Sequence, residues 1–183
     1  MKRSQFDKLV SSVGVVMVTV LLIGAGLLYY AHNFVHKQVH DQLAEQQITF
    51  PPVGPALANL PKEDADAMTA YAGQQLLTGA QAETYANHFI RAHLAQVAEG
   101  KTYAQVSAAA MADPTNAKLA GQANTLFKGE TLRGLLLNAY AFDTMAVIAR
   151  WLALAALLGA ALLGLFVVLG FKHAGNNTGK KRK

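Results

Sequence analysis

The sequence predicts an all-α protein in which two transmembrane helices flank a helical extracytoplasmic domain. Two uncharged apolar stretches, Leu9–Tyr30 and Trp151–Phe171, lie near opposite ends of the 183-residue chain. Each exceeds the about 20 residues that an α-helix needs to cross the hydrocarbon core of a bilayer. The segment between them is polar and almost free of the alternating pattern of β-strands. The predicted segments are a cytoplasmic N-terminus (1–8), a first transmembrane helix (9–30), the extracytoplasmic domain (31–149), a second transmembrane helix (150–171) and a basic cytoplasmic tail (172–183).

The distribution of charge predicts the orientation. The two ends together carry +7 (eight basic residues and one acidic), whereas the segment 32–150 carries −2 (eight basic and ten acidic). Basic residues next to apolar stretches are retained on the cytoplasmic side. We therefore expect a plasma (cell inner) membrane protein with both termini cytoplasmic and its middle outside. The overall charge of +5 is then a topological signal, and no nucleic-acid partner is expected.

The first apolar stretch is predicted to be an uncleaved signal anchor. It is longer than the about 7–15 residues of a signal-peptide apolar region, and no small-residue cleavage site follows it. Aromatic residues gather at the predicted outer boundary, where an apolar ring with a polar edge is favoured. The residues expected at this membrane interface are Tyr29, Tyr30, Tyr140, Arg150 and Trp151.

The second apolar stretch contains a face of small residues. Ala156, Ala160 and Gly164 recur at a spacing of four, and small residues let two helix backbones approach closely in lipid. The first apolar stretch is the simplest partner for this face, and a second copy or another subunit of a membrane complex is the alternative. Neither stretch contains an ionisable residue, which argues against a transporter or a proton relay.

Helices are predicted through most of the connecting segment. The first transmembrane helix continues over 31–47 and is stopped by the proline-rich run 48–61, since proline lacks the amide proton and restricts the residue before it. Thr102 and Gln105 form the Thr-x-x-Gln pattern of a capping box. Further helices are expected over 62–77, 80–98, 102–113, and from about 117 into the second apolar stretch.

The helix predicted over 80–98 has an amphipathic packing stripe. Its apolar residues and one histidine recur at spacings of three and four. The stripe consists of Ala82, Tyr85, Ala86, Phe89, Ile90, His93, Leu94 and Val97. His88 and His93 are five residues apart and point in different directions, so we expect one to be packed and the other exposed.

The best candidate for chemistry is a face of three histidines, His32, His36 and His40. Histidines spaced by four can hold a divalent metal. The outer two are about 12 Å apart along a helix axis, so at most two can reach one ion. Asp41, Glu45 or another helix would have to supply further ligands. The alternative is a polar face above the lipid headgroups, cationic at low pH.

No enzyme signature is found: the hydrolase, P-loop, zinc-protease and dinucleotide fingerprints are all missing from the sequence. Asp64 and Asp66 are expected to stabilise the start of a helix through its dipole. An enzymatic alternative would assemble a site from Glu83, His88, Arg91 and His93. We expect no enzymatic activity and no cofactor.

Several short motifs resemble a family of small actinobacterial integral membrane proteins. They are Ile48-Thr49-Phe50-Pro51, Tyr71-Ala72-Gly73-Gln74, the run from Gln81 to Ile90, Gly100-Lys101-Thr102-Tyr103-Ala104 and Gly129-Glu130-Thr131-Leu132-Arg133-Gly134. The resemblance covers most of the chain from Gln46 onward and implies a helical extracytoplasmic segment beside hydrophobic stretches. It carries no activity and no functional residues. Some members bear the label of aromatic ring-opening dioxygenase, which needs histidines and a carboxylate around iron and does not fit this chain.

The sequence therefore predicts a non-enzymatic two-pass membrane protein that serves as an accessory or scaffold component of a cell-envelope assembly. Its expected partners are the lipid bilayer and either a second copy or another component of a membrane complex. The alternative is a metal-binding or pH-sensing membrane protein that uses the juxtamembrane histidines.

Overall fold

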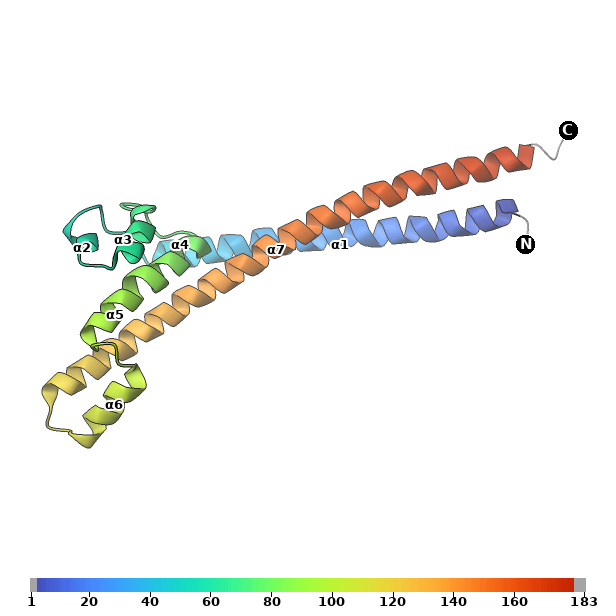
Figure 1. Ribbon diagram of the computed structural model, residues 1–183. Coiled ribbons are helices and arrows are strands. Elements are labelled where there is room, and N and C mark those ends of the chain that lie inside the picture. Colours follow the sequence, from blue (N-terminus) through green and yellow to red (C-terminus); the bar gives the residue numbers. More distant parts are fainter. Residues whose placement is uncertain (1–2, 180–183) are drawn as a thin grey trace. The chain divides into compact units, whose positions relative to one another are not determined.

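The computed structural model describes the backbone of residues 3–179 and the side chains of residues 4–175 (Figure 1). The predicted orientation depends in part on the charges of Lys2, Arg3 and the basic residues 180–183, which lie outside the residues whose side chains the structure describes. The elements in chain order are α1 (Arg3–Glu45), α2 (Pro55–Ala58), α3 (Lys62–Thr69), α4 (Gly79–Thr84), a π-helical stretch (Tyr85–Ile90), α5 (Arg91–Val97), α6 (Tyr103–Ala112) and α7 (Ala117–Gly179). Over residues 3–179 the fold is all-helical, with no strand and one isolated antiparallel bridge between Thr49 and Gln75.

The chain forms two compact units. One combines the described parts of Met1–Phe34 and Met145–Lys183, and the other is Val35–Thr144. We call them the stem unit and the central unit. The boundary at Phe34 lies four residues after Tyr30, and the boundary at Met145 lies five residues before Arg150.

In the stem unit, the N-terminal part of α1 pairs with the C-terminal part of α7 in antiparallel register. The hydroxyl of Ser4 donates to the carbonyl of Ala174 (3.2 Å), and the ring of His32 bonds the carbonyl of Ala146 (2.9 Å). Between these ends, Gly14 lies against Val167 and Gly159 lies against Leu21. Residues further along α1 therefore contact residues earlier in α7, as in any antiparallel helix pair.

The contact between these two helices follows a repeat of seven residues. One series of buried and half-buried residues recurs at alternating intervals of three and four, the spacing of a coiled-coil seam, and Gly24, Val147, Gly159 and Gly164 are half-buried beside it. On α1 the series consists of Ser4, Asp7, Ser11, Gly14, Val18, Leu21, Ala25, Leu28 and His32. On α7 it consists of Ala146, Ala149, Ala153, Ala156, Ala160, Leu163, Val167, Gly170 and Ala174. Seven of the nine α7 positions are Ala or Gly, so the backbones approach closely.

Away from this seam, the stem helices expose their apolar side chains. Both long helices contain a stretch that is long and apolar enough to cross a membrane, and only 17% and 11% of the residues in these stretches are buried. The exposed residues include Val20, Leu27, Leu158, Leu162 and Phe166. A soluble helix of this length buries an apolar stripe and exposes a polar face. Here the exposed faces are themselves apolar.

The core of the central unit forms around Phe50. This ring is completely buried and lies 5.3 Å from the ring centroids of both Tyr71 and Tyr85. Residues from α1 and α7 complete the core, among them Val39, Leu43 and Leu136. Burial in this cluster raises the pKa of the Tyr85 phenol above its usual range.

Residues 79–97 form one continuous helical stretch, as the sequence predicts for 80–98. A capping box closes its start: the Thr78 hydroxyl accepts from the Gln81 N–H, and the Gln81 side chain accepts from the Thr78 N–H. The middle is π-helical from Tyr85 to Ile90. α5 packs along α7, where the side chain of Leu94 occupies the space that a Cβ at Gly129 would need (Figure 1).

The predicted packing stripe on this helix is buried or half-buried except at His93, which is exposed. The capping box at Thr102 and Gln105 is confirmed at the start of α6. The expected helix over 62–77 is wrong in its second half, because α3 ends at Thr69. Gly73 adopts a positive φ of 74°, and the chain then pairs with residues 48–50, with Leu76 N–H donating to Ile48 (2.8 Å).

Replacing Phe50 with alanine should strongly destabilise the central unit. Removing a fully buried aromatic ring leaves a cavity and costs about 3–5 kcal/mol of unfolding free energy. Chemical denaturation of the full chain in detergent, followed by circular dichroism, measures this loss. Val53→Ala is the matched control, because Val53 is 71% exposed and its truncation should change little. Equal effects of the two substitutions would contradict the assignment of Phe50 to the core.

Candidate functional site

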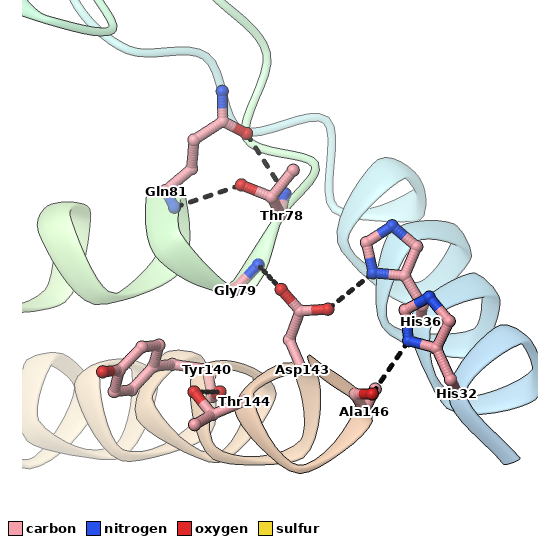
Figure 2. Close-up of polar contacts among 9 residues, drawn as sticks. All are labelled: His32, His36, Thr78, Gly79, Gln81, Tyr140, Asp143, Thr144 and Ala146. Atoms are coloured by element: carbon pink, nitrogen blue, oxygen red, sulfur yellow. Dashed lines mark hydrogen bonds and ion pairs between the residues drawn. The ribbon is translucent and has the colours of Figure 1, made fainter. Parts of the chain in front are cut away.

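A polar cluster of the central unit centres on Asp143 (Figure 2). One carboxylate oxygen lies 2.7 Å from the Nδ1 of His36 on α1. The other accepts from the backbone N–H of Gly79 (3.2 Å), the first residue of α4. Asp143 itself belongs to α7, and its side chain is only 13% exposed. A single carboxylate therefore joins three segments that lie far apart in the sequence.

Gly79 and Asp143 fit each other closely. A Cβ at Gly79 would lie 2.5 Å from the Cβ of Asp143, so glycine permits the approach. The carboxylate caps the N-terminal end of the helical stretch 79–97, where unpaired N–H groups and the helix dipole favour a negative charge. The capping box of Thr78 and Gln81 satisfies the neighbouring groups (Figure 2).

Sequence reasoning missed Asp143. The signal that would have found it is its isolation, because no acidic residue follows it in the sequence and the nearest one before it is Glu130. An acid placed directly before a long apolar stretch needs a polar partner. The identity of that partner depends on the fold and is not encoded in any local spacing.

The three candidate metal ligands bond to different groups. In the stem unit, the Nδ1 of His32 lies 2.9 Å from the Ala146 carbonyl, and the residue is buried. In the central unit, His36 bonds Asp143, and the Nδ1 of His40 lies 3.4 Å from the carboxylate of Asp41. Lys37 hydrogen-bonds to Asp41 and, with a smaller contribution from His40, holds the pKa of that carboxyl below its usual range.

Among the described residues, no group of three or more His, Asp or Glu side chains is placed to hold a metal ion. His36 with Asp143 and His40 with Asp41 are each pairs of one imidazole and one carboxylate. A site for zinc needs three or four such ligands. The metal-binding hypothesis therefore stays a prediction that requires ligands from elsewhere.

A second polar cluster of the central unit surrounds Asp64 at the start of α3. The Nδ1 of His88 lies 2.7 Å from its carboxylate, and an Arg91 nitrogen lies 3.5 Å from the same oxygen. Asp64 is buried. The imidazole of His88 and the guanidinium of Arg91 are the groups that compensate its charge. As predicted, one histidine of the pair is packed, namely His88, and the other, His93, is exposed and bonds the Phe89 carbonyl.

A third network connects the same helix to α7. The guanidinium of Arg133 donates to the side-chain oxygen of Asn87 (3.0 Å) and lies 3.3 Å from Glu130. The amide of Asn87 donates in turn to Glu83 (2.7 Å). Of the four residues in the enzymatic alternative, only His88 and Arg91 therefore share a partner. Glu83 and His93 belong to other contacts.

An apolar groove of about 300 Å³ lies between α1 and α7 in the central unit. Its walls include Val39, Leu43, Leu135 and Phe142, and its polar lining consists of uncharged amide side chains. Leu135 and Phe142 are 62% and 56% exposed. No charged residue lines the groove, which distinguishes it from the polar clusters described above.

The residues predicted at the membrane interface and the small-residue face are placed as follows. In the stem unit Tyr29, Tyr30 and Trp151 are exposed, and the Arg150 guanidinium lies 5.6 Å from the Trp151 ring centroid. Tyr140, in the central unit, is 41% exposed. Ala160 is buried in the helix–helix seam, whereas Ala156 and Gly164 are half-buried. A Cβ at Gly164 would meet no neighbouring atom within 4 Å.

Comparison of the chain with protein-family models, curated proteins and solved structures finds no match.

Substituting Asp143 with alanine should destabilise the central unit. The change leaves the buried N–H of Gly79 without its acceptor and removes one partner of His36, which together cost about 1–3 kcal/mol. Denaturant unfolding of the full chain in detergent tests this expectation. Asp66→Ala is the matched control, since Asp66 is an exposed acid that forms an ion pair with Lys62, one helical turn away. Asp143 would have no structural role if its substitution were as mild as the control.

Proposed function

We propose that this chain is a two-pass integral membrane protein whose segment 31–149 is a helical extracytoplasmic domain, and that it serves as a non-enzymatic accessory or scaffold component of a cell-envelope assembly. Both termini are cytoplasmic in this proposal. The surrounding lipid and one apolar segment of another envelope component are its partners.

The observation that carries the membrane part is the matched register of the two apolar stretches. Across the stem unit, His173 lies 4.0 Å from Asp7 and the ring of His32 bonds the carbonyl of Ala146. This register brings Lys8 level with Lys172 at one end and Tyr30 level with Arg150 at the other. Between these levels both helices are uncharged for 22 and 21 residues, about 32 Å at the helical rise. A bilayer core is about 30 Å thick.

The surface chemistry of the stem unit also supports a lipid environment. Its apolar side chains point away from the helix pair, and exposed apolar patches of this extent are rare in soluble monomers. At the Tyr30 level, Tyr29, Tyr30 and Trp151 are exposed, as expected for rings at a headgroup boundary. The basic residues of the chain ends favour a cytoplasmic location for both termini.

The groove of the central unit supports the scaffold part of the proposal. Leu132, Leu135 and Phe142 are exposed along it, and exposed apolar patches with a polar rim mark protein interaction sites. The uncharged lining favours an apolar helix or strand as its occupant over a charged peptide. The polar clusters around Asp143 and Asp64 are internally paired, and we assign them a structural role.

Cysteine labelling tests the topology directly, because the chain has no cysteine of its own. In intact spheroplasts, a membrane-impermeant maleimide should label Met111→Cys, whose position is 72% exposed. Lys172→Cys should react only after lysis. Leu158→Cys should resist labelling in both cases, since a thiol in hydrocarbon does not form the reactive thiolate. Labelling of Lys172→Cys before lysis would reverse the proposed orientation.

The groove makes a separate prediction about partners. Tagged protein purified in mild detergent should retain a stoichiometric partner, and Leu135→Asp should reduce that recovery at least about tenfold, because it places a charge in an apolar contact. Met111→Asp is the control, with a comparably exposed side chain outside the groove. Equal recovery with both variants would remove the groove from the proposal.

A further inference from the structure

The stem unit contains a groove of about 550 Å³ between α1 and α7, near the level of Lys8 and Lys172. Its walls are apolar, and its polar lining is concentrated near one end of the groove. The apolar wall includes Phe6, Val10, Leu163, Phe166 and Leu169, and the polar residues are Asp7, Ser11 and His173. Phe166 and Leu169 are exposed, so the groove opens onto the apolar surface of the helices.

Asp7 is the unusual residue of this groove. One of its carboxylate oxygens, Oδ2, is buried and has no hydrogen-bond partner. The Nε2 of His173 lies 4.0 Å from it, beyond hydrogen-bond distance. Burying one carboxylate oxygen without a donor is costly, and a cationic group beside the exposed part of the Asp7 side chain, 21% of its surface, offsets that cost.

The chemistry around Asp7 restricts the identity of that partner. A half-buried carboxylate favours a cationic group that can donate hydrogen bonds. Lys8 and Lys172, each next to a groove residue in the sequence, are exposed and favour a negative group on the side of Asp7 nearer to the apolar stretches. Gly14 and Leu163 extend the groove toward the apolar part of the helices, where a hydrocarbon chain is favoured. Ammonium, phosphate and acyl chain occur in this order in an aminophospholipid.

We propose that this groove binds a phospholipid with a primary-ammonium headgroup, of the phosphatidylethanolamine class. The ammonium donates to the exposed part of the Asp7 carboxylate, the phosphate lies toward Lys8 and Lys172, and one acyl chain follows the wall formed by Val10 and Phe166. This assignment rests on the proposed membrane location. A bare metal ion is less suitable, because no group of three His, Asp or Glu ligands is found within the described part of the chain.

Headgroup selectivity tests the proposal. The full chain in detergent is mixed with equal amounts of phosphatidylethanolamine, phosphatidylcholine and phosphatidylglycerol with matched acyl chains, and bound lipid is counted by native mass spectrometry. Phosphatidylethanolamine should be preferred about tenfold over phosphatidylcholine, whose headgroup has no N–H to donate to the Asp7 carboxylate. Phosphatidylglycerol, which lacks the cation, should also bind less.

Three variants connect this preference to the groove. Asp7→Asn removes the charge and should abolish the preference, while Asp41→Asn, at a carboxylate of the central unit, should leave it intact. Val10→Trp fills the groove and should lower the occupancy of all three lipids. Equal binding of the three lipids, a preference for phosphatidylglycerol, or a preference retained in Asp7→Asn would overturn the proposal.

The same preparations separate this proposal from the membrane assignment. Each variant is first tested by the cysteine labelling described above. A chain that labels as a two-pass protein but shows no headgroup preference contradicts the lipid site alone. If Leu158→Cys is labelled as readily as Met111→Cys, that result contradicts the membrane location on which the site depends.

Discussion

In α1 and α7 the backbone hydrogen bonds are made within each helix, so the outer surfaces of both helices can be apolar without leaving polar groups unpaired. This is the condition that hydrocarbon imposes on any chain that crosses it. In the proposed membrane location, lipid supplies no hydrophobic force between the helices, and their association depends on close packing. The small residues of the stem seam, such as Ala153, Ala160 and Gly14, provide that packing. The register that they set is what brings the ends of the two apolar stretches to common levels.

The outline of the fold could be predicted from the sequence because it depends on local signals. Long apolar runs, prolines after position 50 and the Thr102 capping box each act over a few residues. The predicted end of α1 and the predicted starts of α6 and α7 agree with the structure, whereas the short helix α2 lies in the proline-rich run, where no helix was expected. The pairing of residues 48–50 with 74–76 could not be predicted this way. It depends on a turn at Gly73 and on the burial of Phe50, which join segments about 25 residues apart.

The polar clusters were less predictable than the fold. The sequence singled out histidines because their spacing of four is visible in one dimension, yet each carboxylate that pairs with His36 or His88 comes from a distant segment. Asp143 and Asp64 have no spacing signal that connects them to these histidines. Asp7 was visible only as a charge near the N-terminus. Its buried oxygen and the groove beside it result from the approach of α7, which no local pattern encodes.

The core around Phe50 has a consequence for how the chain is made. Its members run from Val39 on α1 to Leu136 on α7, and all of them precede Trp151. Under the proposed topology, the ribosome completes the last fully buried core residue 15 residues before the second apolar stretch begins. At about 5–20 residues per second, this interval lasts about 1–3 s. Helical domains fold in microseconds to milliseconds, so the exported segment has time to fold before the second helix enters the bilayer and fixes the chain at both ends.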